Sequence, residues 1–206
     1  MSDTELHRPH RGVSAADRKR TRRSALIEAG LELFGTNASG DVTIDQICKH
    51  AHLNKRYFYE SFGSARELRD AVVGDLLRKL STGLFPLIAI GGRHDPEPAI
   101  NFFVRTVFSD PRIARLLFTD ADVGGSPSER AHFIDGAVNL WLAADPETPD
   151  DPRLLRRFRL GAYAYSGACG EVMLAALTGK LDCSETEIVE YLVELLAGMR
   201  GTFTVP

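Results

Sequence analysis

Long apolar segments are missing from this sequence of 206 residues. The longest run without a formal charge is 80–92, and its 13 residues include glycine and proline. A membrane-spanning helix needs about 20 apolar residues, so we expect no membrane segment and no membrane partner. The first 30 residues contain a run of arginines and no apolar stretch, so we also expect no secretory signal.

Cysteine is scarce as well, with three in the sequence: Cys48, Cys169 and Cys183. They are far apart and form no Cys-x-x-Cys pair. An odd, scattered set argues against a disulfide framework and against a zinc site. His50 and His52 stand two positions apart and do not share a helical face. We therefore expect no metal site, no cofactor, and a reduced, cytoplasmic globular protein.

Catalytic motifs are also absent. The sequence has no Gly-x-Ser-x-Gly and no His-Glu-x-x-His, and the nearest glycine upstream of Thr178-Gly179-Lys180 is Gly170, in the wrong place for a phosphate loop. The acidic cluster at 145–151 is interrupted by prolines, as in a solvated loop. We expect no catalytic residues and no enzymatic activity.

Charge is present but unevenly distributed. The formal net charge is −3, yet residues 1–62 carry 10 Lys and Arg against 8 Asp and Glu, whereas the remainder carries 15 against 20. Five cations occupy the six positions from Arg18 to Arg23. On its own such a run is typical of a solvated helix face. Beside a nucleic-acid-binding motif it can follow a phosphate backbone.

Apolar spacing and helix start signals predict an all-α fold. Residues 1–14 show no apolar periodicity and are expected to form a disordered tail. Pro86 and the segment Gly91–Pro98 are expected to end a long helix that opens at a Ser64–Glu67 capping box and carries Leu68 and Leu80. The other helices are expected over 16–35, 43–51, 54–59, 99–108, 111–118, 128–143, 152–178 and 185–200.

Three short helices within about 45 residues, with a tight break at His52–Leu53, indicate a helix-turn-helix unit. Thr43 and Gln46 predict a capping box at the start of the second helix, and Asn54 is the expected N-cap of the third. Small and apolar residues would pack these two helices together: Ile44, Ile47, Ala51, Leu53 and Phe58.

The N-terminal turn of the third helix would enter the major groove of DNA. Its groove-facing residues would be Asn54, Lys55, Arg56 and Tyr57, whose side chains can reach base edges or phosphates. Tyr57 could instead be a packing residue. The expected phosphate contacts are the Tyr59 hydroxyl, Thr43 with the free N–H groups of its helix, and Arg18 and Arg22 on the first helix.

The segment TIDQICKHAHLNKRYFYESFGSARELRDAVV resembles the DNA-binding domain of TetR-type transcriptional regulators. In that family the first helix ends in phenylalanine, as in Leu33-Phe34, and a Thr-led helix with Ile and a small residue follows, as in 43–48. The family's Leu/Phe-Tyr-x-x-Phe closure stands here at 58–62. The resemblance covers residues 17–80, whereas residues 81–206 share only helical character and length.

Two positions depart from the family pattern. His52 replaces the family's turn glycine, so either His52 adopts a left-handed conformation or the turn differs. Ala65 replaces a lysine that opens the fourth helix, and Arg66 is the neighbouring candidate for that phosphate contact.

The resemblance implies a helix-turn-helix DNA-binding domain at 15–63 and a helical ligand-binding and dimerisation domain at 64–206, joined by a linking helix at 64–83. Aromatic and apolar residues of the middle helices are the candidate pocket, although they could equally be core: Phe102, Phe103, Val107, Phe118, Trp141 and Tyr165. Two stripes on the last two helices are the candidate dimer interface, unless they pack within the protomer: Gly161, Ala164, Ala168, Ile188, Leu192, Leu195 and Met199.

The sequence therefore predicts a homodimeric repressor that binds a pseudo-palindromic double-stranded DNA operator and releases it on binding a small apolar or amphipathic effector. The alternative is an all-α interaction or ligand-binding protein with a decayed DNA-binding domain, with His52 and Ala65 as symptoms. Thr43, Lys55, Arg56 and Tyr59 favour the first interpretation.

Overall fold

The computed structural model describes residues 14–36, 42–91, 94–119, 127–144, 148 and 150–203, and every regular element among them is helical. The elements are α1 (Ala15–Thr36), α2 (Ile44–His50), α3 (Lys55–Tyr59), α4 (Ala65–Gly91), α5 (Glu97–Ser109), α6 (Pro111–Ala114), the π-helix η1 (Arg115–Thr119), α7 (Pro127–Ala144), α8 (Pro152–Leu177) and α9 (Glu185–Phe203). The predicted all-α class is confirmed. Of the expected tail, residues 1–13 lie outside the described residues.

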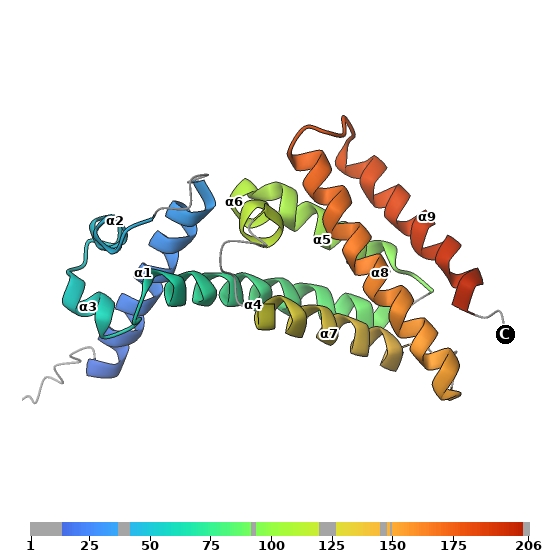
Figure 1. The fold of residues 1–206 in the computed structure, drawn as a ribbon, viewed down its shortest axis with the longest axis horizontal. Coiled ribbons are helices and arrows are strands. Elements are labelled where there is room, and N and C mark those ends of the chain that lie inside the picture. Colours follow the sequence, from blue (N-terminus) through green and yellow to red (C-terminus); the bar gives the residue numbers. More distant parts are fainter. Residues whose placement is uncertain are drawn as a thin grey trace, which may run out of the picture.

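The elements form two groups that α4 connects (Figure 1). Helices α1, α2 and α3 pack together at one end, and α5 to α9 form a bundle around the other half of α4. None of the helices in the described ranges combines the length and the apolarity needed to cross a membrane.

Helices α2 and α3, on either side of the predicted turn, both begin at the predicted capping residues. The Thr43 hydroxyl accepts from the Gln46 backbone N–H at 3.3 Å, and the Gln46 side-chain oxygen accepts from the Thr43 N–H at 2.8 Å. The Asn54 side chain accepts from the Tyr57 N–H at 3.1 Å. Both predicted caps are confirmed, and each satisfies donors that a helix start leaves unpaired.

Each of the first four helices contributes one completely buried side chain to a common core. Leu26, Ile47, Phe58 and Leu68 come from α1, α2, α3 and α4 and are each 0% exposed. Burying a side chain of this size stabilises a protein by about 1.5–3 kcal/mol. This shared core fixes the orientation of the short helix α3 relative to α4.

The long helix α4 continues through Pro86, which was expected to help end it, and ends at Gly91, where the predicted loop begins. Proline removes one backbone hydrogen bond, here to the carbonyl of Thr82. Pro86 and Thr82 are exposed, where water can satisfy that carbonyl, while Leu84 and Ile88 on either side are buried. Burial of the two side chains outweighs the lost hydrogen bond.

The expected helix at 111–118 is divided in two. After one turn, α6 changes into the π-helix η1, a rare geometry that often occurs at functional positions. The Asp110 side chain caps α6 by accepting from the Arg112 N–H at 3.0 Å. The remaining predicted helices agree with the structure to within a few residues.

Candidate nucleic-acid interface

The turn between α2 and α3 adopts one of the two conformations that the sequence left open. His52 has a φ angle of 53°, in the left-handed region that glycine adopts most easily. The Ala51 N–H donates to the Ile47 carbonyl at 2.9 Å, and the Leu53 N–H donates to the Cys48 carbonyl at 2.9 Å. His52 therefore accepts the left-handed conformation, and the turn keeps its hydrogen bonds.

Helix α3 has five residues and has one buried side and one exposed side. Phe58 is fully buried against Phe62. On the opposite side the Arg56 side chain is 84% exposed, and Lys55, Tyr59 and the cap residue Asn54 are also exposed. The exposed first turn is available to a DNA groove.

The cations of α3 are held by carboxylates of this domain. Lys55 Nζ lies 2.9 Å from Asp45 Oδ1 on α2, and this hydrogen bond raises the pKa of Lys55. Arg56 Nε donates to Glu60 Oε1 at 3.2 Å. Exposed ion pairs of this kind contribute only about 0–1 kcal/mol. A phosphate or a base edge can therefore replace either carboxylate at small cost.

Tyr57 differs from its neighbours because it is half-buried. The Arg22 guanidinium of α1 lies over its ring, 4.3 Å from the centroid, and Arg22 also lies 3.6 Å from Glu60. Arg22 thus stacks on Tyr57 of α3, and its contacts are made within the protein. Of Arg56 and Tyr57, both in the first turn of α3, Arg56 is therefore better placed to reach a base.

Further cations extend the basic surface from α3 along α1. Arg18, Lys19, Arg20 and Arg23 are exposed; Arg20 pairs with Asp17 at 2.5 Å, and the Arg23 guanidinium lies 4.2 Å from the Phe62 ring centroid. Arg66 is exposed at the start of α4, beside Ala65, and Thr43 is exposed at the start of α2. The predicted DNA-contacting residues all lie on α1, at the caps and in the turns of α2 and α3, or at the start of α4.

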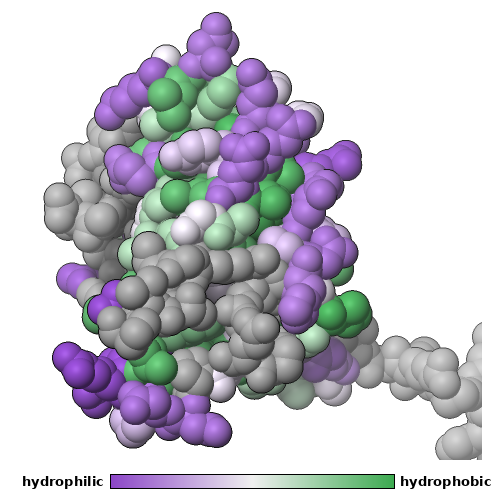
Figure 2. Space-filling model, turned by 90° about the vertical axis from the view of Figure 1, so that its right-hand side faces the viewer, coloured by the Kyte–Doolittle hydropathy of each residue, from purple (hydrophilic) through white to green (hydrophobic). Residues whose placement is uncertain are grey.

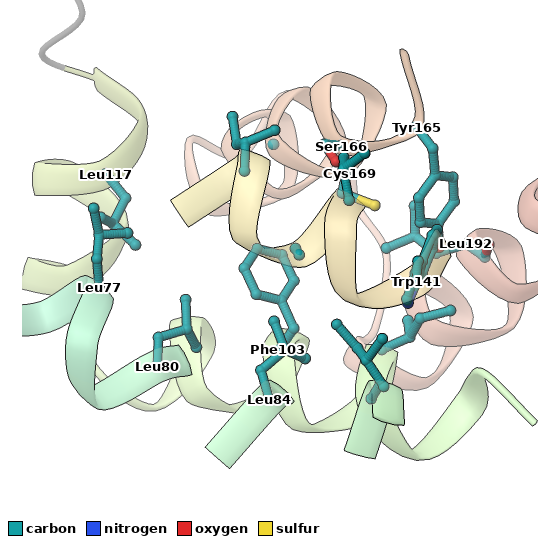
Figure 3. Close-up of a pocket in the computed structure, with 17 residues that line it drawn as sticks. Leu77, Leu80, Leu84, Phe103, Leu117, Trp141, Tyr165, Ser166, Cys169 and Leu192 are labelled. Carbon is teal, nitrogen blue, oxygen red and sulfur yellow. Dashed lines mark hydrogen bonds between the residues drawn. The ribbon is translucent and has the colours of Figure 1, made fainter. Parts of the chain in front are cut away.

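A cavity lies in the second group of helices, between α4, α5, α7, α8 and α9, with a volume of about 120 Å³. Figure 3 shows Leu77 and Leu117 at one end of it and Trp141 and Tyr165 side by side at the other. Burial raises the pKa of the Cys169 thiol to about 12 and also raises the pKa of Tyr165. Both groups are therefore neutral at physiological pH.

Three of the predicted pocket residues, Phe103, Trp141 and Tyr165, line this cavity. Phe102 does not line it and packs instead on Gly83, where any Cβ would overlap its ring. Val107 is buried in the core beside the cavity, and the Phe118 side chain lies outside the described parts. Sequence reasoning missed the aliphatic lining from α4, Leu77, Leu80 and Leu84, whose helical spacing is also that of an ordinary core face.

Two pairs of neighbouring residues join the cavity to the core of the N-terminal helices. In α4, Leu76 belongs to that core and Leu77 lines the cavity. In η1, Leu116 belongs to the same core and Leu117 lines the cavity. At these two places the wall of the cavity is therefore adjacent to side chains of the DNA-binding core.

Polar contacts also join α6 and η1 to the end of α1. Arg112 donates to Glu32 of α1 at 2.6 Å and to Asp110 at 2.7 Å, and this hydrogen bond lowers the pKa of Asp110. Arg115 donates to the Thr36 carbonyl at 2.8 Å. These cross-domain contacts had no signal in the sequence, because Glu32 and Arg112 are 80 positions apart.

Some of the candidate dimer residues lie on the buried sides of α8 and α9, and others do not. Ile188, Leu192 and Gly161 are buried within the protomer, so these three are not available for a surface between copies. Ala164 is exposed, and the remaining predicted residues, Ala168, Leu195 and Met199, are half-buried. The exposed face carries other small and apolar residues: Leu160, Gly167, Tyr191, Ala197 and Gly198.

These elements define a helix-turn-helix DNA-binding protein with an attached helical domain. Residues 26–72 match the family model for bacterial regulatory proteins of the tetR family. The matched segment therefore has the DNA-binding domain of tetR-family regulators.

Solved structures share the fold over most of the chain. A TetR-like transcriptional regulator from Rhodococcus sp. RHA1 is 21% identical, with a TM-score of 0.63 over 89% of this chain and 97% of that one. The fatty acid degradation regulator FadR from Bacillus halodurans is 13% identical, with a TM-score of 0.67 over 85% and 94%. A regulator from Aquifex aeolicus VF5 is 18% identical, with a TM-score of 0.60 over 86% and 99%. No curated protein sequence matches significantly.

Proposed function

We propose that this protein is a cytoplasmic, homodimeric repressor whose operator affinity falls when a small molecule enters the cavity between α4 and α9. The single observation that carries this proposal is the continuity between the cavity and the DNA-binding core. Leu76 and Leu116 belong to the DNA-binding core. Their neighbours in sequence, Leu77 and Leu117, line the cavity. Packed cores respond to strain by switching between arrangements, so a ligand in the cavity can shift the position of α3.

Operator recognition in this proposal comes from the exposed first turn of α3. Arg56 and Lys55 exchange Glu60 and Asp45 for groups of the DNA, while Arg18, Tyr59, Thr43 and Arg66 are assigned to the sugar-phosphate backbone. Sequence information comes from base edges, whereas phosphate contacts set the position of the protein.

Dimerisation is assigned to the exposed face of α8 and α9. A Cβ built at Gly167 or Gly198 would meet no atom within 4 Å, so helices of a second copy can approach closely there. Figure 2, viewed from this side of the molecule, shows apolar and pale residues bordered by hydrophilic ones. Two copies present two α3 helices, as a pseudo-palindromic operator requires.

A substitution that fills the cavity tests the link between cavity and operator without knowledge of the effector. Ala137 of α7 lines the cavity, and Ala143 of the same helix is exposed. Ala137→Phe is expected to weaken operator binding by about tenfold, a typical allosteric coupling, and Ala143→Phe is the matched control. The operator is a duplex selected from random DNA by the wild-type protein, and affinity is measured by fluorescence anisotropy. Equal affinities for two folded variants would contradict effector-driven release.

A further inference from the structure

Among the described residues that line the cavity assigned to the effector, one has a buried polar side-chain atom with no hydrogen-bond partner in the described parts of the chain. The Trp141 Nε1 atom is buried and makes no hydrogen bond with any described residue. A buried N–H donor is normally paired, and an unpaired one destabilises the protein. Trp141 lines the cavity, and its ring lies 5.5 Å from that of Tyr165, centroid to centroid.

The two hydroxyl donors of the described lining are engaged within the protein. The Tyr165 hydroxyl donates to the Leu192 carbonyl at 2.9 Å. The Ser166 hydroxyl donates to the Ala162 carbonyl of its own helix at 2.9 Å, and the Cys169 thiol is only a weak donor. Trp141 Nε1 is therefore the strong side-chain donor of the described lining that remains for a ligand.

The lining also determines the charge of the occupant. Its described residues are aliphatic or aromatic apart from Ser166, Cys169 and the polar atoms of Trp141 and Tyr165, and none carries a formal charge. A carboxylate or an ammonium group would lose its hydration here without gaining an ion pair, which is strongly unfavourable. A neutral molecule enters without this cost.

The size of the cavity limits the occupant further. Its volume is about 120 Å³, and an engineered apolar cavity of about 150 Å³ is known to hold one benzene ring. We propose that the cavity binds a neutral, apolar ligand of single-ring size with one hydrogen-bond acceptor, and that Trp141 Nε1–H donates to this acceptor. The assignment rests on the proposed function, because it specifies the ligand class of the same site.

Three probes of similar size separate the contributions of shape, acceptor and charge. Acetophenone offers a neutral carbonyl, ethylbenzene has the same outline without an acceptor, and benzoate carries a charge. Titration calorimetry with the full-length protein is expected to show that both neutral probes bind and that benzoate binds at least about a hundredfold more weakly than acetophenone.

Trp141→Phe removes the donor and keeps an aromatic ring. The ratio of the acetophenone Kd to the ethylbenzene Kd is expected to rise about three- to tenfold in this variant, the effect of one hydrogen bond. Phe103→Leu is the matched control, because it removes lining area without a polar atom and should leave the ratio unchanged.

The wild-type protein provides a second measurement that needs no variant. Trp141 is the single tryptophan of the sequence, so a ¹⁵N-labelled sample gives one indole N–H resonance. Acetophenone is expected to move its proton signal downfield, as hydrogen bonding does, and ethylbenzene is not.

Two results would overturn the assignment alone: an unchanged Kd ratio in Trp141→Phe without a downfield shift in the wild type, or benzoate binding as tightly as acetophenone. In either case the cavity still binds a small molecule, and the proposed function stands. Absence of binding by both neutral probes would instead contradict the cavity as an effector site, and with it the proposed function.

Discussion

Replacing Arg56 by alanine is expected to weaken binding to the selected operator by about 1–3 kcal/mol and binding to random DNA much less. The Arg56 side chain is 84% exposed and its present partner, Glu60, is a weakly held surface carboxylate. A guanidinium at this place can bind a guanine edge, and losing a base contact lowers discrimination between sequences. Fluorescence anisotropy on operator and random duplexes measures both affinities.

Tyr59→Phe is the matched comparison for Arg56→Ala. The Tyr59 hydroxyl lies on the exposed side of α3 and is assigned to a phosphate, so its removal should weaken both duplexes by similar factors. If Arg56→Ala leaves the ratio of operator to random affinity unchanged, Arg56 does not face the groove. The left-handed turn at His52 would then be the first place to look for a different orientation of α3.

A glutamate at Gly167 is expected to convert the dimer into monomers at micromolar concentration and to lower operator affinity by at least about a hundredfold. Gly167 is exposed, and a Cβ there meets no atom of its own protomer within 4 Å, so the fold tolerates the side chain. In a two-fold interface, each copy contributes the same charge, and like charges in contact cost several kcal/mol. Multi-angle light scattering gives the mass directly.

Ala89→Glu is the control for this charge, because Ala89 is exposed on α4, which is not part of the proposed interface. It should remain dimeric and bind the operator normally. Leu160→Glu provides an independent variant on the same face of α8, since Leu160 is 70% exposed. Dimers of unchanged stability in both Gly167→Glu and Leu160→Glu would place the interface elsewhere on the molecule.

Local signals allowed the N-terminal helices to be predicted closely. The Thr43–Gln46 capping box and the Asn54 cap depend on residues three positions apart, and both form as expected. The first-turn position of Lys55 and Arg56 follows from that cap. Their pairing with Asp45 and Glu60 was not predicted, because exposed ion pairs leave little trace in a sequence.

Features that depend on packing between distant helices were predicted less well. An apolar stripe such as Ile188 and Leu192 can face either the protomer core or a second copy, and only the packing of α5 and α8 against α9 decides that both are buried. The sequence does not show that α4 continues through Pro86, because the burial that holds the helix together there comes from α5 and α7. The cavity is likewise defined by several helices at once, from α4 to α9.

Selection of binding sites from random duplex DNA by the full-length protein tests the central claim, that this chain recognises an operator as a dimer, most directly. We expect repeated rounds at physiological salt to enrich a pseudo-palindrome whose half-site centres are about 10 base pairs apart or a multiple of that distance, because two α3 helices must enter successive major grooves on one side of the duplex. A pool that remains random, or that enriches only a single half-site without its inverted copy, would contradict the account.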